Sequence, residues 1–184
     1  MRVITGSARG IRLDTLEGLD VRPTTDRVKE GMFSAIQFDV PGARVLDLFA
    51  GSGQLGIEAL SRGAKQAVFV DLSQKSLDVV KQNLKKTHLI DRAELHKMAA
   101  EQFIAMQRPE SYDIVLLDPP YRMDILGKIL PLLAPLVRPG GAVIAEHEKN
   151  CILPEKILNL RLQKEYFYGK IVVSVYELTE EVDP

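Results

Sequence analysis

The chain has 184 residues, which is enough for one domain with a full hydrophobic core. Its formal net charge of −1 argues against a protein that holds nucleic acid by bulk positive charge, although a local basic surface remains compatible with it. One cysteine, Cys151, excludes an internal disulfide; no paired Cys/His spacing suggests a metal site, and no apolar stretch suggests a signal peptide or a membrane span. We therefore expect a cytoplasmic protein without metal and without membrane contact.

Residues 1–22 are expected to form a small β-hairpin extension, with short strands at 2–6 and 11–15 on either side of a glycine-containing turn. The first thirteen residues include three arginines and no acid. A helix is predicted over 23–38, because a proline and two threonines are suitable start signals and apolar residues then recur at helical spacing.

From residue 43 the sequence alternates between strands and helices, which favours right-handed crossovers and a parallel, doubly wound sheet. The predicted strands are 43–49, 66–72, 93–98, 112–118 and 141–147, and the predicted helices are 55–63, 73–87, 99–107 and 123–137, the last kinked or broken near Pro131. Residues 160–178 read as an antiparallel hairpin that turns at Tyr168 and Gly169. The expected fold is thus α/β and Rossmann-like, with a mostly parallel seven-stranded sheet in a domain spanning 23–184.

The stretch GSGQLG (51–56) fits the pattern G-x-G-x-x-G and follows the first strand of the alternating region. Ligands bind there in doubly wound folds, because glycine lets the backbone approach them closely. Asp71 ends the next strand and can accept hydrogen bonds from ribose hydroxyls. These features predict an adenosine-containing ligand and leave NAD and S-adenosylmethionine open, whereas the glycine pattern alone also fits a turn without a ligand.

Asp47, four residues before the first glycine, favours S-adenosylmethionine over NAD. A dinucleotide needs the helix N-terminus free for its pyrophosphate, and a nearby carboxylate would repel that anion. The same carboxylate suits a ligand with an ammonium or sulfonium cation.

A second stretch, DPPY (118–121), follows the fourth predicted strand. Two prolines remove two backbone donors, so the turn presents acceptors only: the Asp118 carboxylate and nearby carbonyls. Such a turn can orient an exocyclic amine toward a methyl donor, and the ring of Tyr121 can stack a base. A plain turn after a strand is the alternative reading.

The sequence resembles a known family. DLFAGSG is similar to the cofactor loop of class I S-adenosylmethionine-dependent methyltransferases, and D-P-P-Y to the catalytic motif of those that methylate amino groups of nucleic-acid bases. RPTTDRVKEGMF (22–33), preceded by GSARGIRL (6–13), resembles the bacterial methyltransferases that modify the guanine N2 amine in 16S rRNA of the small ribosomal subunit.

The resemblance implies the cofactor, the partner and the residues of the site. S-adenosylmethionine would lie against Asp47, Phe49, Ala50, Gly51, Gly53, Asp71, Leu72, Met98 and Ala99. The guanine would lie against Asp118, Pro119, Pro120 and Tyr121. RNA, within a small-subunit particle, would meet Arg2, Arg9, Arg12, Arg22 and Arg27, and the enzyme would act as a monomer.

The chain departs from the family pattern at Met98, where many relatives place an acid that meets the adenine amino group. A backbone carbonyl or Glu101 would then make that contact. Two alternative functions share parts of the pattern: an adenine-N6 or other amino methyltransferase shares the chemistry, and an NAD-dependent oxidoreductase shares the glycine loop. A silent RNA-binding module would need only the basic N-terminus.

Overall fold

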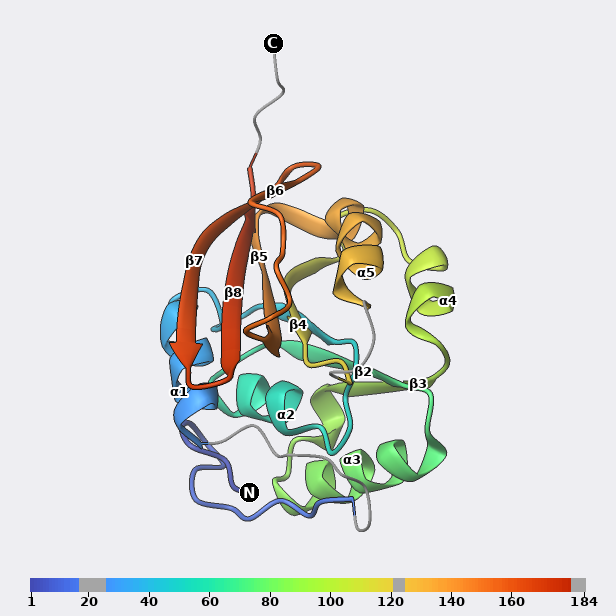
Figure 1. Ribbon diagram of the computed structural model, residues 1–184. Coiled ribbons are helices and arrows are strands. Elements are labelled where there is room, and N and C mark those ends of the chain that lie inside the picture. Colours follow the sequence, from blue (N-terminus) through green and yellow to red (C-terminus); the bar gives the residue numbers. More distant parts are fainter. Residues whose placement is uncertain (17–25, 121–124, 180–184) are drawn as a thin grey trace.

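The computed structural model describes residues 1–16, 26–120 and 125–179, and it shows one sheet with helices on both faces (Figure 1). The eight strands have the order β3-β2-β1-β4-β5-β8-β7-β6. Their bounds are β1 (Arg44–Asp47), β2 (Gln66–Asp71), β3 (Ala93–Lys97), β4 (Tyr112–Leu117), β5 (Val137–Glu148), β6 (Lys156–Ile157), β7 (Leu160–Tyr168) and β8 (Ile171–Leu178). The predicted α/β fold with a mostly parallel sheet and a C-terminal antiparallel hairpin is confirmed, with one strand more than expected.

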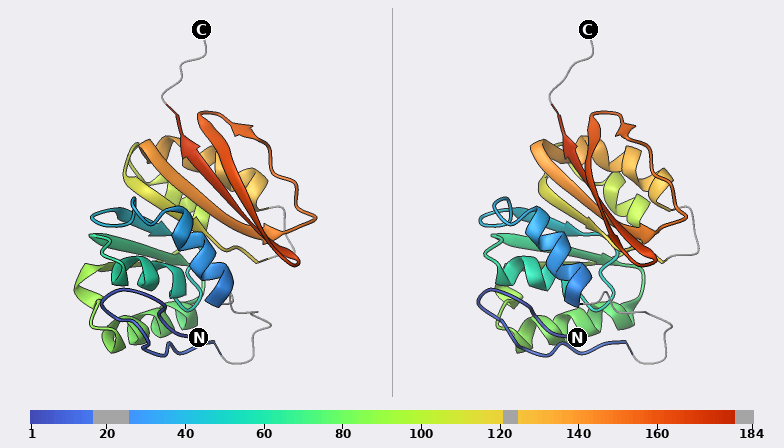
Figure 2. Two further views of the ribbon diagram at one scale, coloured as in Figure 1. Left: turned by 90° about the vertical axis from the view of Figure 1, so that its left-hand side faces the viewer. Right: turned by 60° about the vertical axis from the view of Figure 1, so that its left-hand side comes forward.

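The helices divide between the two faces of the sheet (Figures 1 and 2). They are α1 (Asp26–Ala35), α2 (Gln54–Ser61), α3 (Gln74–Lys86), α4 (Ala100–Ala105) and α5 (Leu126–Leu133). Apolar residues of α1, α2 and α3 share one core with alternate residues of the central strands, and those of α4 and α5 share a second core with the intervening residues. Strands covered on both faces read as apolar runs, which is why the central strands were recognisable in the sequence.

Strand β1 marks the point where the chain changes direction across the sheet. It pairs in parallel with β2 on one side and with β4 on the other. The crossovers through α2 and α3 lead away from β4, whereas β4 and β5 continue on the opposite side. A crevice forms outside the carboxyl ends of the strands at such a reversal, which places the loops after β1 and β4 at its two walls.

The N-terminal segment (residues 1–16) differs from its prediction because side chains of α2 hold its backbone. The two expected stretches do pair, but only through one antiparallel bridge, Arg2 to Arg12, flanked by a hydrogen bond from the Val3 N–H to the Ile11 carbonyl (3.0 Å). Glu58 accepts from the backbone N–H groups of Ile4 (2.8 Å) and Thr5 (3.0 Å). These amides are therefore satisfied by a carboxylate instead of a strand partner.

Gly6 allows the N-terminal segment to approach α2 closely. A Cβ atom at Gly6 would lie 1.8 Å from the carbonyl oxygen of Ser61, and the φ angle of Gly6 is +90°. Val3, Ala8 and Leu13 are buried in the same core as α1 and α2. The described part of the predicted extension is therefore packed into the domain, while the predicted boundary at residue 22 lies outside the described residues.

Two further elements differ from expectation. Helix α5 continues through Pro131 to Leu133 and ends in a 3-10 turn at Ala134–Leu136. Its apolar face, with Ile129 and Leu130, is fully buried, and this packing offsets the hydrogen bond that a proline removes. The short strand β6 was not predicted, because two residues are too few to show a period. In the described ranges, no helix is both long enough and apolar enough to cross a bilayer.

Candidate active site

The glycine loop, residues 48–53, joins β1 to α2 at the sheet's reversal point. Gly53 has a φ of +77°, and a Cβ atom there would lie 3.1 Å from both methyl carbons of Val80 on α3. Gly51 also has a positive φ, +54°, but a Cβ atom there would meet no atom within 4 Å. The loop is therefore tightly packed at Gly53 and open at Gly51, as expected where a ligand approaches the backbone.

Asp71, at the end of β2, is hydrogen-bonded to the glycine loop. Its Oδ2 accepts from the N–H of Gly51 (2.9 Å), and its Oδ1 accepts from the N–H of Ser73 (2.8 Å). A carboxylate has about four lone-pair sites, so it can accept further hydrogen bonds from ribose hydroxyls. Leu72, expected beside the adenine, is 71% exposed.

Asp47 occupies a different environment from the one its sequence position suggested. Its side chain is 1% exposed, and its Oδ2 accepts from the N–H of Gly56 in the first turn of α2 (2.9 Å). Burial raises the pKa of Asp47 to about 7; the Gly56 hydrogen bond opposes this rise, and the nearby Asp71 carboxylate adds to it. Asp47 thus ties β1 to α2, and a cation in the crevice would favour its charged form.

The loop after β4 begins beside the glycine loop. Asp47 lies opposite Leu116 in the parallel pairing of β1 and β4, and the N–H of Leu48 donates to the Leu116 carbonyl (3.2 Å). Asp118 follows two residues later and is partly buried, Pro119 is buried and Pro120 is exposed. The structure therefore brings Asp118, Pro119 and Pro120 to the same edge of the sheet as the glycine loop, whereas Tyr121 lies outside the described residues.

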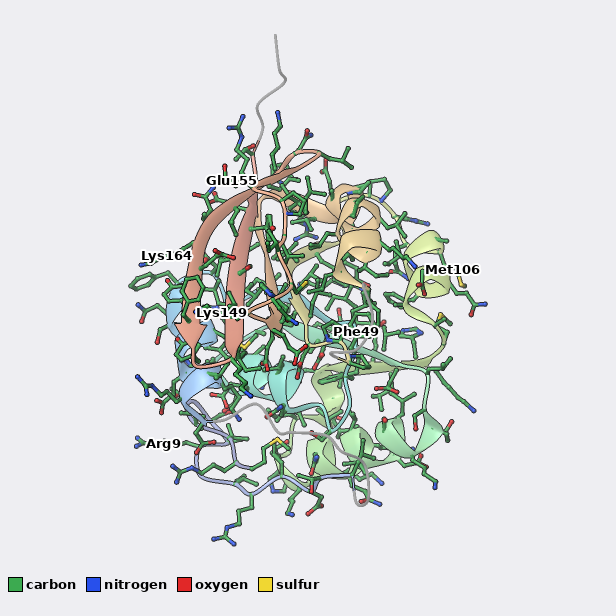
Figure 3. All side chains as sticks on the ribbon, viewed as in Figure 1. Arg9, Phe49, Met106, Lys149, Glu155 and Lys164 are labelled. Atoms are coloured by element: carbon green, nitrogen blue, oxygen red, sulfur yellow. The ribbon has the colours of Figure 1, made fainter. Side chains whose placement is uncertain are left out.

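The expected adenine end of the site lies between β3 and α4. The N–H of Met98 donates to the backbone carbonyl of Asp71 (3.2 Å), which fixes this loop beside the end of β2. Met98 and Phe49 are partly buried against the core on the α4 and α5 face. Figure 3 shows Phe49 near the centre of the molecule, among the ends of the central strands.

The other residues expected at the cofactor site lie in the same region. Ala50 is buried, and its N–H donates to the Val70 carbonyl (3.0 Å). Ala99 is partly buried and caps the N-terminus of α4. Glu101 is exposed in the first turn of α4.

Four of the five arginines expected to face RNA are described, and all four are exposed: Arg2, Arg9, Arg12 and Arg27. Arg2 forms an ion pair with Asp26 at the start of α1 (3.0 Å). Figure 3 shows Arg9 on the same side of the molecule as α1. Arg22 lies outside the described residues.

The buried polar residues that hold the site together were not recognised in the sequence. Asn83 of α3 donates to the carbonyl of Ser52 in the glycine loop (2.9 Å). Lys29 of α1 is fully buried, lies 3.5 Å from Glu58 and donates to the Arg2 carbonyl (2.6 Å). Both Lys29 and Asn83 lie in helices where a polar residue normally predicts an exposed position, so no local signal revealed their burial.

Comparison with known proteins places the chain in a family. The family described as "Conserved hypothetical protein 95" matches residues 1–177. The chain belongs to this family. The resemblance noted from the sequence is thereby confirmed, because relatives of the chain are named as small-subunit rRNA methyltransferases.

Two relatives match almost the whole chain. "Putative rRNA methyltransferase YlbH" of Bacillus subtilis is 40% identical over 96% of this chain and 98% of its own length. "Ribosomal RNA small subunit methyltransferase D" of Haemophilus influenzae is 34% identical over 96% of this chain and 93% of its own length.

The solved structures agree with the family assignment. The structure of "Putative methyltransferase yhhF" of Escherichia coli is 32% identical, covers 98% of this chain and 99% of its own, and has a TM-score of 0.83. The fold is that of S-adenosylmethionine-dependent methyltransferases. In the described ranges, no group of three or more His, Cys, Asp or Glu side chains could hold a metal ion.

Proposed function

We propose that this protein transfers a methyl group from S-adenosylmethionine to the exocyclic N2 amine of a guanine in 16S rRNA of the small ribosomal subunit. The observation that carries the proposal is the adjacency of two loops. The glycine loop, bound to Asp71, and the turn at Asp118 follow neighbouring parallel strands and open at one edge of the sheet. The names of the relatives agree with rRNA as the substrate class.

The residues of the glycine loop and its neighbours fit S-adenosylmethionine, which supplies an electrophilic methyl group on a sulfonium centre. The space beside Gly51 admits the ligand, and the Asp71 carboxylate accepts from the ribose hydroxyls. Asp47 lies behind the loop and stabilises a cation there more strongly when its carboxyl is ionised. Met98 and Leu72 form the apolar border of the adenine site.

Asp118 and the Pro119 carbonyl orient the guanine amine. The amine lone pair is delocalised into the ring, so the nitrogen is a poor nucleophile until its N–H groups are held by acceptors and the lone pair faces the methyl carbon. Bound S-adenosylmethionine would supply the methyl carbon to this nitrogen, with its sulfur as the leaving group that keeps the bonding electron pair. The nitrogen then releases a proton to solvent, and the Asp118 carboxylate stabilises the positive charge that develops before this release.

An NAD-dependent oxidoreductase is not supported by the same residues. The buried Asp47 lies under the N-terminal turn of α2, where a pyrophosphate would otherwise bind. Calorimetric titration distinguishes the two cofactors, because S-adenosylmethionine is expected to bind and NAD is not. Saturable binding of NAD without binding of S-adenosylmethionine would contradict the proposal.

The substrate is tested by tritiated methyl transfer to RNA and to small-subunit particles from a strain that lacks the enzyme. After digestion to nucleosides, mass spectrometry is expected to place the label in N2-methylguanosine. Label in N6-methyladenosine would keep the amino-methyltransferase chemistry and contradict guanine as the substrate. Absence of label from every RNA species would contradict the proposed function as a whole.

A further inference from the structure

One basic and two aromatic side chains follow one another along one face of β7, beside α1. Lys164, Tyr166 and Tyr168 follow one another at every second position, so they project from the same face of the strand. The Lys164 ammonium lies over the Tyr166 ring, 4.9 Å from its centroid. We call Lys164, Tyr166, Tyr168 and the neighbouring Arg27 of α1 the β7 row.

Helix α1 completes the β7 row. The hydroxyl of Tyr168 lies against Gly31, where a Cβ atom would be 1.6 Å from it, so only glycine at this helix position admits the ring. Arg27 lies one turn earlier on α1. Burial and the neighbouring Tyr166 raise the pKa of Tyr168, and Arg27 opposes this rise because its cation is close to the phenol.

The Tyr168 end of the β7 row lies at the end of the sheet where the proposed methyl-transfer site opens. Glu148, the last residue of β5, pairs with Ile171, the first residue of β8, and Ile171 pairs with Tyr168. Because β5 is parallel to β4, the Tyr168 turn lies at the same end of the sheet as Asp118. Figure 1 shows this turn beside α1, and Figure 3 shows Lys149 near the turn and Lys164 farther along β7.

The side chains of the row remain accessible in part. Lys164 and Arg27 are exposed, and Tyr166 and Tyr168 are partly buried with their inner edges against the core. Strand β6 pairs with β7 only at Leu160 and Arg161. The outer side of β7 beyond Arg161 is therefore not paired with β6. Rings anchored on one side by a core and bordered by cations present a pre-ordered surface, so binding costs little side-chain entropy.

Nearby acids limit the net charge of this surface. Glu165 lies on the opposite face of β7, where its Oε1 accepts from the Ser174 hydroxyl (3.1 Å). Glu30 is exposed three residues after Arg27 on α1. The net positive charge of the row is therefore too small to bind a polyanion by charge alone. The row suits a ligand that has flat rings to stack on the tyrosines and negative charges spaced between those rings.

We propose that the β7 row is a stacking platform for single-stranded RNA next to the target guanine. This inference rests on the proposed function and deepens it, because the platform would hold the strand as it enters the Asp118 site. Bases stack on Tyr166 and Tyr168, and Lys164 and Arg27 neutralise the phosphates between them. Such stacking tolerates any base, so the platform contributes affinity and leaves the choice of nucleotide to the Asp118 site.

The test measures binding of a fluorescent single-stranded oligoribonucleotide by anisotropy. The Tyr166→Ala variant is expected to weaken binding about 5- to 100-fold, which corresponds to the loss of one stacked base. Tyr166→Phe keeps the ring and is expected to stay within about twofold of the wild-type Kd. Lys164→Ala is expected to weaken binding less and to flatten its dependence on salt between about 50 and 200 mM.

Phe167→Ala is the matched control, because Phe167 is 60% exposed on the same strand but projects from the opposite face. It is expected to bind RNA within about twofold of the wild type. The melting temperature and the Kd for S-adenosylmethionine of every variant establish that folding and the cofactor site are intact. In methyl-transfer assays, Tyr166→Ala is expected to raise the KM for RNA and to leave kcat unchanged.

Three results would overturn the platform. Tyr166→Ala could bind RNA as tightly as the wild type, or Phe167→Ala could be as impaired as Tyr166→Ala. Alternatively, Tyr166→Ala could lose affinity for assembled particles but keep its affinity for naked RNA, which would assign the surface to a protein partner. Direct RNA binding separates this test from the proposed function, which would fail instead if the wild-type protein methylated no RNA.

Discussion

Asn83 of α3 hydrogen-bonds to Asp14 in the N-terminal segment and, through the same side chain, to the glycine loop. Its Nδ2 donates to the carbonyls of Asp14 (3.0 Å) and Ser52 (2.9 Å), and its Oδ1 accepts from the N–H of Asp14 (2.8 Å). The side chain is fully buried. The segment proposed to face RNA and the loop proposed to hold the cofactor are therefore linked through one amide.

Replacing Asn83 by Asp tests this link. The carboxylate keeps the acceptor for the Asp14 N–H but loses both donors and faces two carbonyl oxygens. We expect a loss of about 2–4 kcal/mol in the free energy of unfolding and a rise of about tenfold in the Kd for S-adenosylmethionine. Urea unfolding and calorimetry measure the two effects. Asn150→Asp, at an exposed position, is the control, and equal behaviour of the two variants would contradict the link.

Asp47→Asn tests the buried carboxyl behind the glycine loop. Burial raises the folded pKa from 3.8 to about 7, so the folded protein holds a proton that the unfolded chain has released between about pH 4 and 7. The free energy of unfolding of the wild-type protein therefore falls as the pH rises through this window. Asparagine cannot ionise and can still accept from Gly56, so the variant should lack this component and be more stable at pH 8 by on the order of 1 kcal/mol.

The same variant is expected to bind S-adenosylmethionine more weakly at pH 8, because the charge that favours its cation is gone. Chemical unfolding at pH 5 and pH 8 supplies the measurement, and Asp39→Asn, an exposed acid, is the control. A pH dependence identical to that of the wild-type protein would show that Asp47 does not titrate in this range.

Glu58→Gln tests the buried cluster that holds the N-terminal segment. Glu58 is fully buried and contacts Lys29 (3.5 Å) and Arg62 (2.8 Å). Removing its charge leaves Lys29 buried without its ion-pair partner and with only the weaker attraction of Asp26, which should cost about 3–5 kcal/mol of stability. Burial already lowers the pKa of Lys29 against the opposing effect of Glu58, so the variant should lower it further.

The stability lost in the Glu58→Gln variant should therefore shrink as the pH rises toward 10. At such a pH the variant can fold with Lys29 deprotonated, and the unfolded chain then binds more protons than the folded one, so the free energy of unfolding of the variant rises with pH. Unfolding curves at neutral and alkaline pH measure this trend, with Glu101→Gln as an exposed control. A loss that stays constant with pH would show that Lys29 is not the source of the cost.

Substitution of Gly56 is expected to lower the stability of the fold, whereas substitution of Gly51 is expected to lower the affinity for the cofactor. A Cβ atom at Gly56 would lie 2.3 Å from the Phe69 ring, so Gly56→Ala should destabilise the fold by about 1–3 kcal/mol. Gly51 has open space at this position, so Gly51→Ala should cost only about 1 kcal/mol for its positive φ while its methyl group obstructs the cofactor. Melting curves and calorimetry compare the two variants, and a larger loss of cofactor affinity in Gly56→Ala would reverse the assignment.

Much of the fold could be predicted because its central strands are short apolar runs separated by helices of regular period. The glycine loop, Asp71 and Asp118 were recognisable for a related reason: each ends or directly follows a strand, and parallel strands bring such positions to one edge. The burial of Asp47 against Gly56 was not recognisable, because an acid at a strand end has the same sequence pattern whether it faces a crevice or a helix.

The N-terminal segment was predicted as a pairing of two stretches, but the extent of its strands was not predicted correctly. Its strand pattern is real, since Arg2 and Arg12 do form a bridge, but Glu58 and Ser61 of α2 satisfy amides that a second strand would otherwise pair. These partners lie more than fifty residues away in the sequence, so no local pattern contains them. The alternation of Lys164, Tyr166 and Tyr168 was visible as a strand, but its position beside Arg27 depends on how α1 packs.

The Asp118→Ala variant tests the central claim, that the acceptors after β4 orient an amine for methyl transfer, most directly. Single-turnover methylation of RNA is measured together with the Kd for S-adenosylmethionine, and Asp118→Asn, which keeps one acceptor oxygen, serves as the intermediate case. We predict a loss of at least about a hundredfold in the rate for Asp118→Ala, with cofactor affinity within about threefold of the wild type. A rate equal to that of the wild-type protein, at unchanged cofactor affinity, would contradict the account.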